Sequence, residues 1–190
     1  MVSDPFDAAV EALRAGQVVV IPTDTVYGVA VDPFVEGATQ RLFDAKRRPR
    51  DVTLPVLVGD PADIERVAIV SDLARSLIDA HWPGGLTVVV RRRDDVTFDL
   101  GTNEATVGVR CPDHDLVRSL LRRTGPLAVT SANLHGDPTP ETADGVRAAL
   151  GDAVAVVVDG GPCAGEPSTV VDCTGTGPVV LRQGSLTIEL

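Results

Sequence analysis

Several polar side chains of this sequence stand directly after apolar runs that predict strands. Thr25 follows the first such run, Arg110 closes another, and Ser131 and Asn133 follow a third. Because α/β sheets usually keep their binding sites at strand ends, these side chains are candidates for one shared site. The alternative for each is a local role, as a turn hydroxyl, a cap or one half of an ion pair.

A second candidate is the basic segment that contains Lys46 and Arg48. Segment 41–50 has five basic residues and one acid, whereas the whole chain has a formal charge of −10. Pro49 disfavours the helical conformation at Arg48, so a helix should end near Arg47 and let Lys46 and Arg48 converge on one spot. This pair predicts an anion clamp for phosphates; the alternative is that basic residues oppose the dipole of a helix C-terminus.

The segment 106–110 alternates polar and apolar residues. In a strand, Thr106, Gly108 and Arg110 would share one face. An arginine at a strand end suits bidentate contact with a carboxylate or phosphate. Nearer the C-terminus, Ser168 and Arg182 each stand at an element boundary.

The chemistry that these residues can perform is anion binding and charge stabilisation. The candidates are hydroxyls, guanidiniums, one ammonium and one amide, and no His–Ser, Cys–His or paired carboxylate arrangement is evident. The three cysteines and three histidines have no metal-ligand spacing, and no P-loop motif occurs. The pattern favours catalysis by positioning and electrostatics, as in phosphoryl or nucleotidyl transfer.

Apolar periodicity predicts an α/β (α+β) fold in which a twisted mixed parallel and antiparallel sheet has flanking helices. The pattern has no internal repeat or linker, which predicts one domain over residues 1–190. The predicted strands cover 18–21, 54–58, 86–92, 106–110, 127–130, 153–158, 168–173 and 179–182. The predicted helices cover 5–15, 37–47, 61–67, 71–81, 113–124 and 141–150.

Composition and charge exclude some classes of protein. The apolar runs are too short to cross a bilayer, and residues 1–5 lack the basic and apolar pattern of a signal peptide. A cytoplasmic location without membrane association is therefore expected. The net charge of −10 and the six aromatic residues disfavour a nucleic-acid groove.

Taken in order, seven motifs resemble the YrdC-type threonylcarbamoyl-AMP synthases. The motifs are PTDTVYG, AKRRP, WPGGLT, VGVRCP, TSAN, STVVD and LRQG, and the resemblance runs from about residue 16 to 184. The combination of K-x-R, here Lys46 and Arg48, with S-x-N, here Ser131 and Asn133, is specific. Because the chain ends at Leu190, it resembles the short form with a single YrdC-like domain and a concave ligand face.

The resemblance implies synthesis of threonylcarbamoyl-AMP and pyrophosphate from L-threonine, bicarbonate or CO2, and ATP. The product would supply t6A at position 37 of tRNA through a downstream threonylcarbamoyl-transferase complex, and tRNA itself would bind weakly at most. Mg²⁺ would accompany ATP, with no protein ligand named. The implied L-threonine positions are Thr25, Tyr27, Arg110 and Ser168. The implied ATP positions are Lys46, Arg48, Thr106, Ser131, Asn133, Thr139 and Arg182, with Lys46 and Arg48 as the catalytic pair.

The sequence departs from that family's pattern at a few positions. Val52 stands where many relatives have a polar residue, and Leu57 stands where some have histidine. Two alternatives remain open at this point: an RNA-binding module that binds double-stranded RNA or tRNA without catalysis, and a carbamoyl- or acyl-transfer domain.

Overall fold

The computed structural model describes residues 5–188, and the segment 1–4 considered above lies outside them. The described residues form five α-helices, two 3-10 helices and ten strands. In chain order these are α1 (Pro5–Arg14), β1 (Val19–Ile21), β2 (Gly28–Val31), α2 (Ala38–Lys46), β3 (Val56–Leu57), η1 (Pro61–Arg66), β4 (Ala68–Ile69), α3 (Asp72–His81), β5 (Leu86–Arg92), β6 (Thr106–Arg110), α4 (Asp115–Thr124), β7 (Leu127–Ser131), α5 (Ala143–Leu150), η2 (Gly151–Ala153), β8 (Val156–Val157), β9 (Thr169–Asp172) and β10 (Val179–Arg182).

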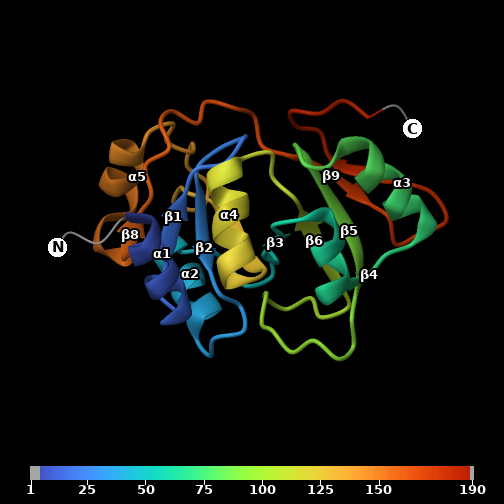
Figure 1. Ribbon diagram of the computed structural model, residues 1–190, viewed down its shortest axis with the longest axis horizontal. Coiled ribbons are helices and arrows are strands. Elements are labelled where there is room, and N and C mark those ends of the chain that lie inside the picture. Colours follow the sequence, from blue (N-terminus) through green and yellow to red (C-terminus); the bar gives the residue numbers. More distant parts are fainter. Residues whose placement is uncertain (1–4, 189–190) are drawn as a thin grey trace.

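All ten strands belong to one mixed sheet (Figure 1). The order is β10-β9-β5-β6-β3-β7-β2-β1-β8, and β4 pairs with β5 outside this path. The pairs β5/β9, β3/β6 and β1/β8 are parallel, whereas the other pairs are antiparallel. The predicted mixed sheet with flanking helices is therefore confirmed.

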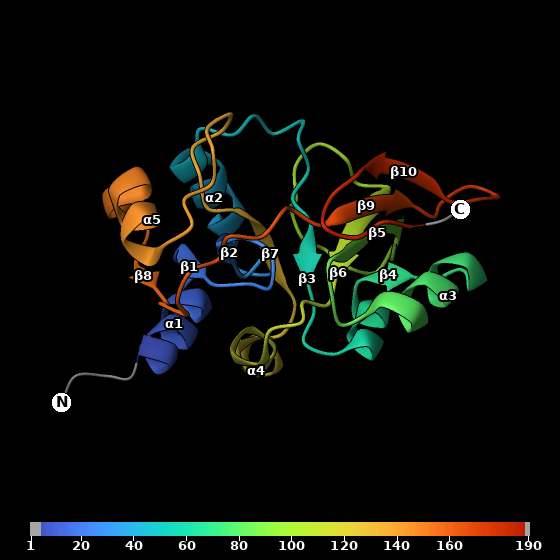
Figure 2. The same ribbon diagram turned by 90° about the horizontal axis from the view of Figure 1, so that it is seen from above.

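Helices cover the sheet from two sides. Figure 2 shows α1, α4 and α3 along one side, and α2 on the opposite side near β1 and β2. The helices α1 and α4 bury Leu13 and Leu120 against Ile21 and Val129 of the sheet. A larger core cluster includes residues of α2, α3 and α5.

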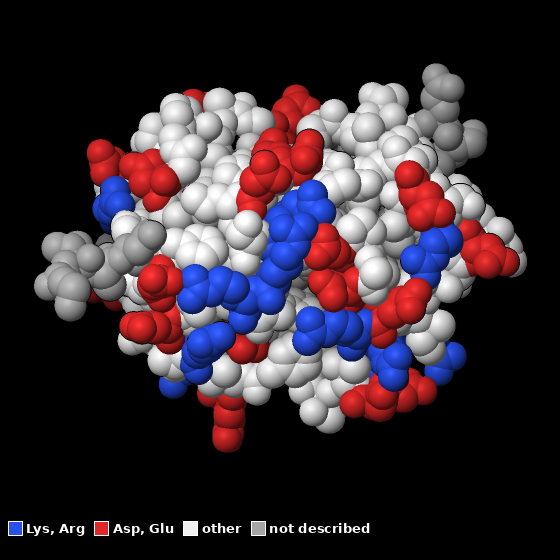
Figure 3. Space-filling model, viewed as in Figure 1, with Lys and Arg blue, Asp and Glu red and all other residues white. Residues whose placement is uncertain are grey.

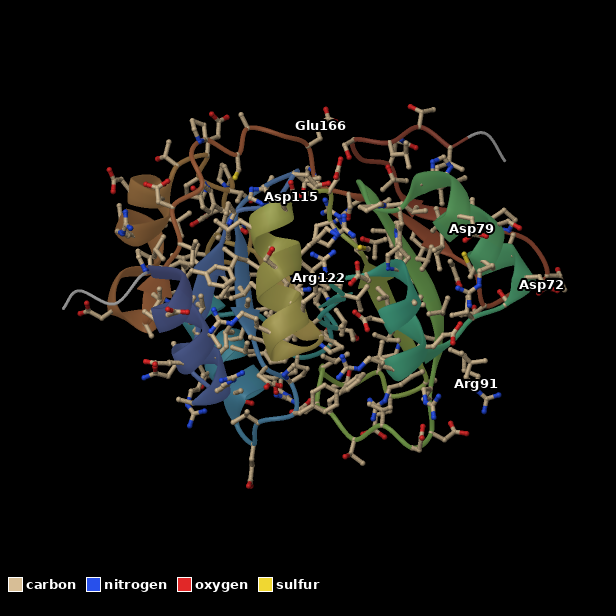
Figure 4. The ribbon with its side chains drawn as sticks, in the orientation of Figure 1. Asp72, Asp79, Arg91, Asp115, Arg122 and Glu166 are labelled. Atoms are coloured by element: carbon tan, nitrogen blue, oxygen red, sulfur yellow. The ribbon has the colours of Figure 1, made fainter. Side chains whose placement is uncertain are left out.

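Helix α4 illustrates why these segments are helical. Val117, Leu120 and Leu121 are buried at helical spacing. Asp115 stands at its start and Arg122 near its end, so both charges oppose the helix dipole (Figure 4).

The end of α2 determines where the basic segment points. The helix ends at Lys46, and Arg47 adopts the left-handed conformation with φ 51°. The amides of Arg47 and Arg48 donate to the carbonyls of Asp44 and Phe43, which satisfies the last turn of the helix. The predicted helix end near Arg47 is therefore confirmed.

Some predicted elements were wrong or missing. The strands β2 and β4 were not predicted; β2 is fully buried between β1 and β7, so it shows no alternation of polar and apolar residues. The segment predicted as a helix over 61–67 is the 3-10 helix η1, which has Pro61 in its first turn. In residues 5–188, no helix combines the length and the apolar character that a membrane span requires.

Candidate functional site

A cavity of about 610 Å³ gathers most of the residues that the sequence singled out. Its walls come from strands on both sides of β3 and from the segment that follows α2. Eight of the eleven expected site residues line it: Thr25, Arg48, Thr106, Arg110, Ser131, Thr139, Ser168 and Arg182. The remaining three, Tyr27, Lys46 and Asn133, are not among its lining residues.

Arg110 is held from three directions at one end of the cavity. Its Nε donates to the carbonyl of Gly84 at 2.9 Å, and its Nη1 donates to Thr25 Oγ1 at 2.8 Å. Its Nη2 forms an ion pair with Asp24, and the side chain is 7% exposed. A guanidinium has five N–H groups, so two remain for a ligand. The buried charge can therefore receive a carboxylate without losing its protein partners.

Hydroxyl groups lie beside this arginine along the floor of the cavity. The register of β5 with β6 and with β9 places Thr87 next to Arg110 on the cavity side of the sheet. Ser168 lies beside Thr87. Thr87 Oγ1 and Ser168 Oγ are 2.8 Å apart, and Arg182 Nη2 donates to Ser168 Oγ at 3.2 Å. Burial, and then the charge of Arg110, lower the pKa of Arg182.

The middle of the cavity floor carries no polar side chain. Gly108 and Val89 face each other across β6 and β5, and both line the cavity. Because Gly108 has no side chain, a ligand can lie directly on the backbone there. Beyond it, Asn103 Nδ2 donates to Thr106 Oγ1 at 2.8 Å, so both side chains form the next polar wall.

The segment after α2 supplies Arg48 to the opposite wall. Arg48 Nε donates to the carbonyl of Val52 at 2.9 Å and its Nη2 to that of Thr53 at 3.3 Å. Burial lowers the pKa of this guanidinium, which nevertheless stays charged at neutral pH. Val52 contributes its carbonyl here, and Leu57 lines the cavity with an apolar side chain.

Lys46 lies behind this wall and is 1% exposed. Its Nζ donates to the carbonyl of Ser131, to the carbonyl of Asn133 at 2.6 Å and to Asn133 Oδ1 at 3.2 Å. Burial, and then the nearby charge of Arg48, lower the pKa of Lys46 to about 8. Asn133 is also buried, with Oδ1 accepting from Ser131 Oγ at 2.5 Å.

Tyr27 has a different place from the one expected for it. Its side chain is completely buried in the core. The hydroxyl donates to the carbonyl of Gly161 at 2.7 Å and accepts from the amide of Gly160 at 3.2 Å. Tyr27 therefore fixes the loop after β8 and does not form a wall of the cavity.

The charge of the cavity is opposite to that of the chain. Its charged lining residues in the described part of the chain are Arg48, Arg110, Arg182 and Asp172. Three cations line the cavity against one carboxylate, and Asp24 beside the cavity pairs with Arg110, so a net positive charge remains that favours an anionic ligand. The polar and apolar floor can hold the rest of such a ligand.

Some contributing residues were not foreseen from the sequence. Thr87 lies within an apolar run, and only the alternation of that strand could have indicated that it faces the cavity with Gly108. Asp24 and Gly84 belong to motifs that were noted, but their contact with Arg110 joins segments that are far apart in the chain.

A second hollow of about 830 Å³ lies on the other side of the end of α2. It is lined by Arg47 and Leu134 among others, together with residues of α5 and η2. None of the expected site residues lines it. The smaller cavity, where those residues gather, is therefore the candidate site.

Metal ligation by the protein alone finds no support in residues 5–188, where no group of three or more His, Cys, Asp or Glu side chains could hold an ion. Asp172 is the carboxylate that the described residues bring to the cavity. This set of donors suits a Mg²⁺ ion that keeps waters and is carried mainly by phosphates.

Comparison with known proteins places this geometry in a family. The sequence model named Sua5_yciO_yrdC, described as Telomere recombination, matches residues 11–184. A protein of Mycobacterium tuberculosis named Putative threonylcarbamoyl-AMP synthase is 47% identical over 184 residues, which are 96% of this chain and 85% of that protein. The Threonylcarbamoyl-AMP synthase of Bacillus subtilis is 38% identical over 192 residues, and the match covers 98% of this chain and 56% of that longer protein.

A solved structure agrees with the sequence matches. The crystal structure of P. abyssi Sua5 complexed with L-threonine superposes with a TM-score of 0.89 at 34% identity. The superposition covers 94% of this chain and 54% of that one. With a match over most of its length and a shared fold, the chain belongs to the Sua5/YciO/YrdC family.

Proposed function

We propose that this protein is a threonylcarbamoyl-AMP synthase, which makes threonylcarbamoyl-AMP and pyrophosphate from L-threonine, bicarbonate or CO2, and ATP. The observation that carries the proposal is the joining, in one cavity, of a buried arginine with two spare N–H groups and a separate wall of cationic and hydroxyl groups. The first suits an amino-acid carboxylate and the second suits a nucleotide. The names of the relatives support the same activity.

The amino acid would bind at the Arg110 end of the cavity. The spare N–H groups of Arg110 receive the carboxylate, and Thr25 and Ser168 offer hydroxyls beside it. The presence of L-threonine in the P. abyssi Sua5 crystal structure supports this choice of amino acid. The hydroxyl pair of Thr87 and Ser168 provides polar partners for a hydroxylated side chain.

The nucleotide would bind across the bare floor toward Arg48. Arg48 and Arg182 offer guanidiniums for the phosphates, while Thr106, Ser131 and Thr139 offer hydroxyls around them. Asn133 and Lys46 support this wall from behind. Mg²⁺ would enter with ATP, held mainly by phosphate oxygens near Asp172, and would neutralise part of the phosphate charge.

The reaction proceeds in two steps. The amine nitrogen of threonine forms a bond to the carbon of CO2 and loses a proton, which gives a carbamate. A carbamate oxygen then attacks the α-phosphorus of ATP, and pyrophosphate leaves with the electron pair of the broken P–O bond. The cationic groups of this chain align the two anions and stabilise the charge that develops on the phosphates.

The product would pass to a downstream threonylcarbamoyl-transferase complex for t6A at position 37 of tRNA. The surface gives tRNA little to bind on the face that carries α4, where acidic and basic side chains are mixed (Figure 3). Arg118 and Arg122 both pair with Asp60, and Arg123 pairs with Asp7. Because paired arginines release few counterions from a nucleic acid, this face does not favour the RNA-binding alternative.

The cytoplasmic location expected from the sequence stays a prediction.

The deciding experiment is pyrophosphate release from ATP with purified protein, measured with threonine and bicarbonate together and with each omitted. We expect release only when both are present, and mass spectrometry should identify threonylcarbamoyl-AMP. Arg48→Ala should reduce the release strongly, whereas Arg91→Ala, an exposed arginine on β5 (Figure 4), should not. Pyrophosphate release that is independent of threonine would contradict the proposal. No release together with tight, salt-sensitive tRNA binding would support an RNA-binding module instead.

A further inference from the structure

The ammonium group of Lys46 is completely used by the protein itself. A lysine has three N–H donors and no acceptor. Three oxygens receive them: the carbonyls of Ser131 and Asn133, and Asn133 Oδ1. With 1% of the residue exposed, Lys46 has no N–H free for a phosphate unless one of these bonds breaks.

The segment that receives these bonds has no regular structure of its own. It runs from Ser131, where β7 ends, to Thr142, the N-cap of α5. Lys46 holds it at one further point along the chain, because its own carbonyl accepts from the amide of His135 at 3.0 Å. One residue at the end of α2 thus binds this segment through both its side chain and its backbone.

Asn133 extends these contacts through the segment. Its Nδ2 donates to the carbonyls of Leu134 at 2.8 Å and Asp137 at 2.6 Å. Its Oδ1 accepts from Ser131 Oγ at 2.5 Å and from Thr139 Oγ1 at 3.4 Å. Ser131 and Thr139 are the members of this network that line the cavity. The position of those two hydroxyls therefore depends on Asn133, and that of Asn133 depends on Lys46.

We propose that Lys46 is a positioning residue, which holds the segment 131–139 in place so that Ser131 and Thr139 face the ligand. This proposal concerns the same site as the proposed function, and the importance of Lys46 for catalysis rests on that function. Lysine suits the task because its ammonium directs three bonds from one compact nitrogen, whereas arginine spreads its donors over a wide planar group. The presence of one lysine, at this position, in a chain with sixteen arginines is consistent with this requirement.

The first test uses the protein without any ligand. Lys46→Met keeps the length of the side chain and removes the ammonium. Hydrogen–deuterium exchange should show the amides of 131–139 exchanging at least about tenfold faster in this variant, because several bonds of the segment are lost. Peptides of β5 and β6 should exchange as in the wild type. Arg47→Gln is the matched control, because it removes the adjacent positive charge from an exposed side chain that lines the other hollow.

The second test is a double-mutant cycle on the affinity for a non-hydrolysable ATP analogue. If Lys46 acts through Asn133, then Lys46→Met and Asn133→Ala together should weaken binding by much less than the product of their separate effects. Lys46→Arg is the second variant should Lys46→Met fail to fold, and it should give faster exchange over 131–139 although the charge is kept.

Two results would overturn the proposal: wild-type exchange rates over 131–139 in Lys46→Met, or fully multiplicative effects of Lys46→Met and Asn133→Ala. Either would mean that Lys46 does not act by holding this segment through Asn133. The exchange experiment needs no substrate, so its result stands even if pyrophosphate release fails to support the proposed function.

Discussion

Arg110 and Asp24 form a partly buried ion pair at the edge of the cavity, with 7% and 16% of their side chains exposed. Asp24 shares the guanidinium with Thr25 Oγ1 and the carbonyl of Gly84, so two distant segments fix the plane of this guanidinium. A guanidinium fixed in this way presents its remaining N–H groups in one direction. The orientation of Arg110 is thus determined before any ligand binds.

Arg110→Lys should selectively weaken threonine binding. Lysine keeps the charge but cannot hold Asp24, Thr25 and Gly84 while also binding a carboxylate. Because a charge-assisted hydrogen bond contributes about 1.5–3 kcal/mol, we expect the KM for threonine to rise by about tenfold or more. Steady-state pyrophosphate release measures this, with the KM for ATP expected to change little. Arg91→Lys, on the exposed end of β5, is the control, and an equal rise in both KM values would argue against a threonine site at Arg110.

Tyr27→Phe should affect stability and leave substrate binding unchanged. The hydroxyl holds the loop at Gly160 and Gly161, and its removal deletes two partly buried hydrogen bonds. We expect a loss of about 0.5–1.5 kcal/mol in the free energy of unfolding, measured by urea denaturation. A higher KM for threonine in a protein that remains folded would show that Tyr27 does contact the substrate.

Activity should decline at alkaline pH because of Lys46. Its pKa is about 8 in the folded protein, against 10.5 for an ordinary lysine. Above pH 8 the neutral amine has one N–H fewer, so the bonds to Ser131 and Asn133 cannot all be kept. Pyrophosphate release measured from pH 6.5 to 9.5 should therefore fall as the pH rises through about 8. A rate that stays constant across this range would be inconsistent with a charged Lys46 in the working enzyme.

The same titration predicts the opposite trend for stability. Between pH 8 and 10.5 the unfolded chain binds a proton at Lys46 that the folded chain lacks. The contribution of this group to the free energy of unfolding therefore rises with pH across that window. Lys46→Met should remove that contribution, which a comparison of denaturation curves at pH 7.5 and 9.5 would detect. Equal pH dependence in the two proteins would contradict the lowered pKa.

Gly184→Ala should disturb the backbone behind Ser168. A Cβ at Gly184 would lie 2.1 Å from the carbonyl oxygen of Pro167 and 2.6 Å from the carbonyl carbon of Ser168. Because these are backbone atoms, the segment at Pro167 and Ser168 must shift, and we expect a loss of about 1–3 kcal/mol in the free energy of unfolding. Gly177→Ala, where a Cβ meets nothing within 4 Å, is the control in the same thermal or urea denaturation. Equal stability of the two variants would contradict this packing.

Local rules predicted much of this site. The alternation along 106–110 correctly placed Thr106, Gly108 and Arg110 on one face, because a strand has a strict period of two. Pro49 correctly placed the end of α2, because the residue before a proline avoids the helical conformation.

The parts that could not be predicted depend on contacts between distant segments. Asn133 was expected to join Ser131 in one shared site, but the strand ends at Ser131 and Asn133 turns inward to bond with its own loop. Lys46 donates its hydrogen bonds to Ser131 and Asn133, which lie 85 and 87 positions further along the chain. No local sequence pattern could have predicted these partners. Thr87 is likewise a single polar residue within the apolar run 86–90. Its role in the site follows only from its contact with Ser168, which lies 81 positions further along the chain.

The shortest inner strand of the sheet has a consequence for how the protein responds to its ligands. β3 consists of Val56 and Leu57, and it alone joins β6 on one side to β7 on the other within the strand order. Arg110 and Ser168 lie on the β6 side of β3, whereas Ser131 and Thr139 lie on the β7 side. A molecule that fills the cavity therefore bridges two halves of the sheet that are paired with each other through the short strand β3. Occupation of the site should act as a noncovalent cross-link, and its mechanical effect should concentrate at β3.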